Sequence, residues 1–103
     1  MNTHATDLRT LLQDPSLLET RAYVGGEWIH ADDGKTFAVV NPARGDVIAE
    51  VADLSRAEVA RAIAASAEAM KSWAARTAKE RAQIMRKWFD LMMANQDDLG
   101  RLM

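Results

Sequence analysis

Few side chains in this sequence are able to perform acid–base, nucleophilic or metal chemistry. The 103 residues include two histidines, His4 and His30, and no cysteine. The lack of cysteine excludes disulfides, zinc–thiolate sites and a thiol nucleophile, and a serine-type triad needs a histidine beside its nucleophile. His4 lies in a terminus that is expected to fray, and His30 ends a predicted strand, where a solvated edge residue is the usual interpretation. We therefore predict no catalytic residue within these residues.

Two acidic pairs, Asp32-Asp33 and Asp97-Asp98, are candidates for binding a divalent cation. Adjacent carboxylates point apart on a strand or a helix, and neither pair has a third ligand at the spacing of a cation site. A turn at the first pair and a helix start at the second explain them better, so we predict no metal site. Gly25-Gly26 and Gly45 do not form a GxGxxG or GxxxxGK loop, and we also predict no cofactor-binding residue.

Aromatic and basic side chains suggest ligand stacking or binding to nucleic acid or membrane. Packing explains Trp28 and Trp88 better, because large aromatic side chains dominate cores and interfaces, and Trp73 is placed to anchor the turn that follows it. The basic residues of the last long predicted helix are Lys79, Arg81, Arg86 and Lys87. Glu80 and Asp90 dilute their charge, which is typical of a solvated face.

Composition and charge exclude several classes of protein. The chain has 13 Lys+Arg and 15 Asp+Glu, a formal net charge of −2, with 49% hydrophobic residues. A nucleic-acid binder normally has a basic excess, and no apolar run approaches the roughly 18 residues of a membrane span. We expect neither nucleic acid nor membrane as a partner. The opening residues MNTHATDLRT lack a secretory signal, so we expect a cytoplasmic location.

Periodicity and turn residues predict an α+β fold with three zones: an N-terminal lead-in (1–20), a region of antiparallel β-hairpins (about 21–52) and a helical region (53–103). In the lead-in, Leu8, Leu11 and Leu12 have the spacing of a short amphipathic helix. Asp14 and Pro15 give a second helix start, because Asp is a good N-cap and Pro suits the first helical position.

Turn chemistry sets the predicted hairpins. Gly25-Gly26 suits a two-residue type I′ loop, which pairs Tyr23 with Trp28 on one face and places Ala22, Val24 and Ile29 on the other. A second turn at Asp32-Asp33-Gly34 leads into the strand KTFAVV. The stretch NPARGD then reverses the chain into VIAEVA, with Gly45 in the left-handed conformation.

Two capping boxes, Ser55 to Glu58 and Thr77 to Glu80, begin two predicted helices, of which the second covers about 78–94. The first carries a narrow stripe at Ala60, Ile63, Ala67, Met70 and Ala74. The second carries a ridge at Ala82, Met85, Phe89 and Met92, with a second ridge at Ile84, Trp88 and Leu91. This apolar face is wider than one neighbour would cover.

The end of the predicted helical region (about 55–103) suggests an incomplete domain. Asn95 ends the second helix or caps a third, which would carry Leu99, Leu102 and Met103. No Gly, Pro or basic last turn follows, so we expect the natural fold to continue beyond this sequence.

Three stretches resemble the N-terminal part of the aldehyde dehydrogenase superfamily. YVGGEW is similar to its opening hairpin, and FAVVNPARGDVIAEV to the strand–turn–strand that follows, with Asn41, Pro42, Gly45 and Val51 in the expected places. WAARTAKERAQIMRKWFDLMMANQDDLGRLM resembles the succinate-semialdehyde dehydrogenases, and glutarate-semialdehyde dehydrogenases are nearly as similar. Gly25 stands where Asn or Asp is usual, and Arg44 where Thr is common.

The resemblance implies a scaffold segment that is inactive by itself. The complete enzyme would oxidise succinate semialdehyde to succinate with NADP or NAD, through a thiohemiacetal and a thioester on a cysteine outside this sequence. The partners implied are the remainder of its own subunit, further copies in a homo-oligomer, and a small aldehyde. Glutarate-semialdehyde dehydrogenase is an alternative, and a stand-alone interaction module that uses the apolar face of helix 78–94 is an alternative of another class.

Overall fold

The structure of the chain is a computed structural model that describes the backbone of residues 4–103 and the side chains of residues 8–103. The side chain of His4 therefore lies outside the described residues. The elements, in chain order, are α1 (His4–Leu11), the 3-10 turn η1 (Pro15–Leu17), β1 (Ala22–Val24), β2 (Glu27–Ile29), β3 (Thr36–Val40), β4 (Val47–Ala52), α2 (Arg56–Ala75), α3 (Ala78–Ala94) and α4 (Gln96–Leu102). The predicted α+β fold and its order of elements are confirmed.

The lead-in folds as its leucines and its Asp-Pro pair predict. α1 ends at Leu11, and Leu12 directly after it is one of the most buried apolar residues described, at 6% exposure. Asp14 caps η1 by accepting a hydrogen bond from the Ser16 backbone N–H at 3.1 Å, with Pro15 in the first position. The turn thus leads the chain from α1 to the first strand.

The first hairpin has the predicted register. Tyr23 pairs with Trp28 across β1 and β2, and their rings lie 4.8 Å apart between centroids. Gly25 and Gly26 have φ values of 59° and 85°, which both positions of a type I′ loop require. The loop chemistry therefore fixes which side chains share a face.

The second hairpin, β3 and β4, forms a separate two-stranded antiparallel sheet. Its pairing runs from Thr36 opposite Ala52 to Val40 opposite Val47, with an irregularity between Val39 and Val40 that the sequence did not predict. The turn closes through the Gly45 N–H, which donates to the Asn41 carbonyl at 2.6 Å, and Gly45 has φ 78°.

Both predicted capping boxes are present at the starts of α2 and α3. The hydroxyls of Ser55 and Thr77 each accept the N3 backbone N–H, and the side chains of Glu58 and Glu80 each accept the N-cap N–H. Asn95 ends α3, but its side chain donates to the Leu91 carbonyl at 2.9 Å and does not cap α4. Asn95 was predicted either to end the second helix or to cap a third, and its side chain takes the first of these roles.

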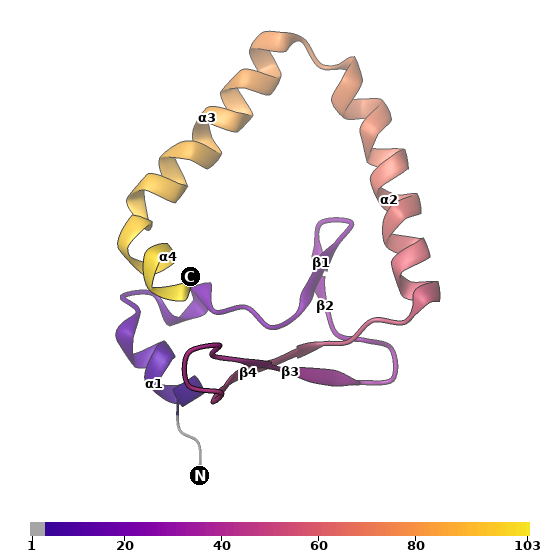
Figure 1. Cartoon of the computed structure of the whole chain (residues 1–103). Helices are drawn as coiled ribbons and strands as arrows, with labels where there is room; N and C mark the ends of the chain where they lie inside the picture. Colours follow the sequence, from indigo (N-terminus) through magenta and orange to yellow (C-terminus); the bar gives the residue numbers. More distant parts are fainter. Residues whose placement is uncertain (1–3) are drawn as a thin grey trace.

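The elements enclose very little core. Figure 1 shows α2 and α3 diverging as two sides of an open triangle, with the hairpins at its base. The radius of gyration is 16.8 Å, whereas a compact domain of this length has about 13 Å. The chain exposes 8047 Å², against roughly 5,800 Å² for a folded monomer of its mass. Leu12 and Ala31 are the buried apolar residues of the described part.

The beginning and the end of the chain are joined by one carboxylate. Asp98 of α4 is 4% exposed, and its two oxygens accept the backbone N–H groups of Gln13 and Asp14 at 2.9 Å each. These hydrogen bonds, first that from Gln13 and then that from Asp14, hold the pKa of Asp98 below its ordinary value, and Arg101 at 3.7 Å adds to the effect. The residue predicted to start a helix thus also forms a tertiary contact, which we name the Asp98 clasp.

Removing the Asp98 carboxylate should release the lead-in. We expect Asp98→Ala to speed tryptic cleavage after Arg9 at least several-fold, because the segment between α1 and η1 loses both hydrogen bonds to α4. Asp97→Ala is the matched control, since Asp97 is exposed in the same first turn of α4. Equal cleavage rates for the two variants would contradict the role of the clasp.

Candidate functional site

The structure does not bring together the side chains that could act as acids, bases or metal ligands. His30 is exposed after β2, and Asp32 and Asp33 lie in the predicted turn before Gly34, which has φ 74°. Asp98 is occupied by the clasp at the other end of the chain. Among the described residues no group of three or more His, Cys, Asp or Glu side chains is placed to hold a metal ion. Within the same residues, no helix is long and apolar enough to cross a membrane.

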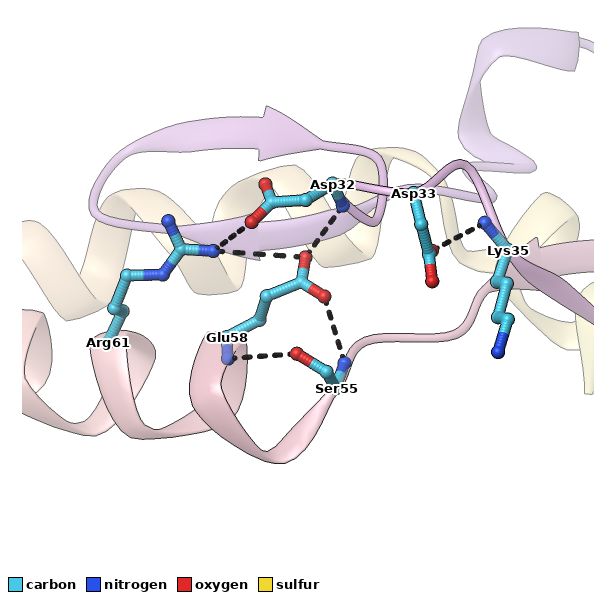
Figure 2. A network of polar contacts seen from close by, with 6 residues as sticks. All are labelled: Asp32, Asp33, Lys35, Ser55, Glu58 and Arg61. Carbon is cyan, nitrogen blue, oxygen red and sulfur yellow. Dashed lines mark hydrogen bonds and ion pairs between the residues drawn. The ribbon is translucent and has the colours of Figure 1, made fainter.

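The best-organised polar cluster surrounds Glu58 at the start of α2, as Figure 2 shows. One oxygen of the Glu58 carboxylate accepts the Ser55 N–H at 2.9 Å, and the other accepts the Asp32 N–H at 2.8 Å. Arg61 pairs with the Asp32 carboxylate and lies 4.0 Å from Glu58. Because Asp32 follows β2, this cluster fixes the first turn of α2 against the end of the first hairpin.

The electrostatics of Glu58 are those of a structural carboxylate. Glu58 is 5% exposed, and the hydrogen bonds from Ser55 and then from Asp32 lower its pKa below the ordinary value. A general acid or base working near neutral pH would need a raised pKa instead. The cluster therefore holds elements in place and has no proton to exchange at neutral pH.

Lys79, Arg86 and Lys87 of α3 are exposed, as predicted for a mixed, solvated face, whereas Arg81 is partly buried. Arg86 pairs with Asp90 at 3.3 Å, and both side chains are exposed. The guanidinium carbon of Arg86 also lies 5.0 Å from the centroid of the Phe89 ring. Nothing in this arrangement concentrates positive charge in the way that a phosphate or nucleic-acid site requires.

The apolar side chains of α3 remain exposed along most of its length. Both predicted ridges of bulky residues are between 40% and 63% exposed: Met85, Phe89 and Met92 on one, and Ile84, Trp88 and Leu91 on the other. Packing was predicted for Trp88 and for Trp28, yet both are about half exposed, so any partner for their outer faces is not supplied by the described residues. Trp73 is also exposed, and its carbonyl accepts the Arg76 N–H in the turn before α3.

The predicted stripe of α2 is not the face that meets the rest of the chain. Ile63 and Met70 are exposed at 65% and 64%, and Ala60, Ala67 and Ala74 are exposed as well. The first hairpin instead approaches a neighbouring ridge, since a Cβ built on Gly25 would lie 3.9 Å from the Cβ of Ala65. The small residue at this approach is therefore Ala65, and Ala62 and Ala69 line the hollow beside it.

Comparison with known proteins gives these exposed faces a context. The family model described as Aldehyde dehydrogenase family matches residues 28–103, most of the chain. The chain belongs to the aldehyde dehydrogenase family. This confirms the resemblance inferred from the hairpins and from the tract that contains α3, and it lends no support to a stand-alone interaction module.

Curated relatives of this aldehyde dehydrogenase segment differ in their named substrates. It is 49% identical to the 3-sulfolactaldehyde dehydrogenase of Pseudomonas putida, 51% identical to the glutarate-semialdehyde dehydrogenase of Pseudomonas putida strain KT2440, and 47% identical to the NADP(+) succinate-semialdehyde dehydrogenase of Escherichia coli K12. Each match extends over 92 residues, or 89% of this chain. The chain spans 19%, about a fifth, of the length of these relatives.

A solved structure shows the same fold. The crystal structure of an aldehyde dehydrogenase from Brucella melitensis biovar abortus 2308 superposes with a TM-score of 0.80 at 59% identity, over 84% of this chain and 18% of that one. The open shape described above is therefore that of a partial piece of the aldehyde dehydrogenase fold.

Sequence reasoning missed the two long-range roles of carboxylates in this segment. The capping box identified Glu58 as a partner of Ser55, but its bond to Asp32 joins residues 26 apart in the sequence. Asp98 carries no local signal beyond its place near a helix start, because its partners precede it by 84 and 85 residues. Periodicity and capping patterns indicate only which residues are neighbours along one helix. They therefore cannot predict contacts between residues that are far apart in the sequence.

Glu58→Ala should loosen the junction between the hairpin and α2. We expect faster hydrogen exchange at the amides of Asp32 and Ser55, which both lose their acceptor, and little change for Glu68→Ala, whose exposed side chain pairs with Lys71 on the same helix. Because folding lowers the pKa of Glu58, its contribution is complete above the ordinary carboxyl pKa and decreases below about pH 4. Protection of the Asp32 amide that stays constant from neutral pH to well below pH 4 would contradict this role.

Proposed function

We propose that this chain is the N-terminal scaffold of an NAD(P)+-dependent aldehyde dehydrogenase that oxidises succinate semialdehyde to succinate. The observation that carries the proposal is the family match over residues 28–103, combined with broad apolar helix faces that the described residues leave uncovered. Glutarate semialdehyde is the second candidate substrate, because the relatives named for it are about as similar as those named for succinate semialdehyde.

The side chains present determine which functions we assign to this chain and which to the remainder of the subunit. This chain has no cysteine to attack the aldehyde carbon and no glycine-rich loop to hold a dinucleotide, so both must come from the remainder of the subunit. The residues described here contribute rigidity: the Glu58 cluster fixes α2 on the hairpin, and the Asp98 clasp joins α4 to the lead-in. NADP or NAD, and assembly into a homo-oligomer, belong to the complete enzyme in this proposal.

The named substrates of the relatives support the substrate class. Succinate semialdehyde, glutarate semialdehyde and 3-sulfolactaldehyde are all aldehydes that carry an acid group at a short distance. We infer that the complete enzyme takes a small anionic aldehyde. The residues that read its length and charge would lie outside this scaffold, because the described side chains form no site for them.

Turnover should require the remainder of the subunit. We expect purified 1–103 to show no reduction of NADP+ or NAD+ with succinate semialdehyde. We expect activity when this chain replaces the 92 aligned residues of the E. coli enzyme. The E. coli enzyme lacking those residues is the control, and it should be inactive. Hydride transfer by 1–103 alone, or a folded chimera without aldehyde oxidation, would refute the proposal.

A further inference from the structure

The turn between the two hairpins contains the only Asp-Gly pair of the sequence, Asp33-Gly34. No other Asp or Asn in the sequence is followed by glycine. Because glycine has no Cβ, its backbone nitrogen is less hindered than that of other residues. At such a pair, this nitrogen can attack the carboxyl group of the preceding aspartate. The pair is therefore a candidate site of covalent change that the proposed function does not involve.

The structure leaves both residues of the pair open to solvent. Asp33 and Gly34 are exposed, and a Cβ built on Gly34 would meet no atom of a non-adjacent described residue within 4 Å. The Asp33 side chain folds back along the backbone, because its Oδ1 accepts the Lys35 N–H at 3.0 Å, as Figure 2 shows. This Asx-type turn holds the carboxyl group beside the peptide that contains the Gly34 nitrogen. The two reacting groups are thus neighbours on an open surface.

One hydrogen bond restrains the nitrogen that would react. The Gly34 N–H donates to the Ala31 carbonyl at 2.9 Å and closes the turn. A single hydrogen bond of an exposed turn opens at a low cost in free energy. This bond therefore slows the attack on Asp33 but does not prevent it.

We propose that Asp33 is a site of spontaneous isomerisation to isoaspartate. The Gly34 nitrogen loses its proton and bonds to Cγ of the protonated Asp33 carboxyl group, while the Cγ–OH bond breaks and one water leaves. The product is a cyclic succinimide, which a water molecule then opens. Cleavage between the nitrogen and Cγ restores aspartate. Cleavage between the nitrogen and the Asp33 backbone carbonyl carbon gives isoaspartate, whose main chain runs through Cβ and Cγ. One water is released and one consumed, and no oxidant or reductant is needed.

The turn is anchored on both sides of the pair, so the isomerisation has a structural consequence. Before the pair, the Asp32 N–H donates to Glu58 at 2.8 Å, and after it the Lys35 carbonyl accepts the Asp53 N–H at 2.9 Å. Isoaspartate adds one backbone carbon between these anchors and removes the i to i+3 geometry of the turn. We therefore expect at least one anchor to open, which loosens the first hairpin from α2 or from the end of β4.

The test follows isomerisation in the complete chain. The chain 1–103 is incubated at neutral pH and physiological temperature, and a brief tryptic digestion releases the peptide 22–35, which contains both Asp32 and Asp33. Isoaspartate at each position is quantified by chromatography and fragment-ion mass spectrometry, with an unincubated sample as the zero point. We expect it to accumulate at Asp33 at least several-fold faster than at Asp32, because the residue that follows Asp32 carries a Cβ.

Two variants separate the chemistry from its structural effect. Gly34→Asn is the matched control, because Gly34 has φ 74° and asparagine tolerates a positive φ while adding a Cβ beside the nitrogen. We expect it to slow the isomerisation at least several-fold. Asp33→Glu keeps the charge and should abolish the reaction, since its longer side chain closes a larger ring far more slowly. After equal incubation, the amides of Asp32 and Asp53 should exchange hydrogen faster in the unsubstituted chain than in Asp33→Glu.

Three results would overturn the inference. Isoaspartate at Asp33 that stays at the level of Asp32 would contradict the assignment of the site. Equal rates in the unsubstituted chain and in Gly34→Asn would contradict attack by an unhindered glycine nitrogen. If Asp33 is largely converted while both anchor amides exchange as slowly as in Asp33→Glu, the structural consequence is refuted. The proposed function is tested separately, by turnover of the chimera.

Discussion

The constraint on which this structure depends is that its helices carry more apolar surface than the chain has atoms to cover. Two long helices with good caps diverge from the turn that joins them, with the short hairpins at the open base, and the side chains that would normally meet in a core remain exposed. Hydrophobic burial is the main favourable contribution to folding. A chain that buries so little apolar surface relies more strongly on its local hydrogen bonds.

Polar contacts hold the elements of this segment together, as a hydrophobic core does in most small domains. The capping boxes fix the first turns of α2 and α3, and the carboxylates of Glu58 and Asp98 connect elements that share few apolar contacts. Both carboxylates are largely buried and fully used by backbone N–H groups, so neither is left for chemistry. In the proposed function, the segment therefore supplies geometry to an aldehyde dehydrogenase subunit, and the reacting groups lie in other parts of that subunit.

Local chemistry made much of this fold predictable. Gly25-Gly26 set the register of the first hairpin, Gly45 the second turn, and the S/T-x-x-E boxes the starts of two helices. The sequence also predicted that Asp32-Asp33 forms a turn. These features depend on residues within one turn or one hairpin, where side-chain chemistry and backbone conformation are directly linked.

The packing of elements that are distant in the sequence was harder to predict. The small-residue stripe of α2 was assigned to Ala60 and Ala67, whereas the hairpin approaches Ala62 and Ala65, because an alanine-rich helix offers several similar ridges. The irregularity at Val39 also escaped the pattern. Substrate and cofactor choice are proposals for the complete enzyme, since no described residue has a geometry that would read them.

The Asp98 clasp can form only late in the synthesis of the chain. The amides of Gln13 and Asp14 leave the ribosome 85 and 84 residues ahead of the carboxylate that receives them. At about 5–20 residues per second, this delay amounts to roughly 4 to 17 seconds. During that interval the N-terminal helix can already pack against β4, and its attachment to α4 follows when α4 emerges.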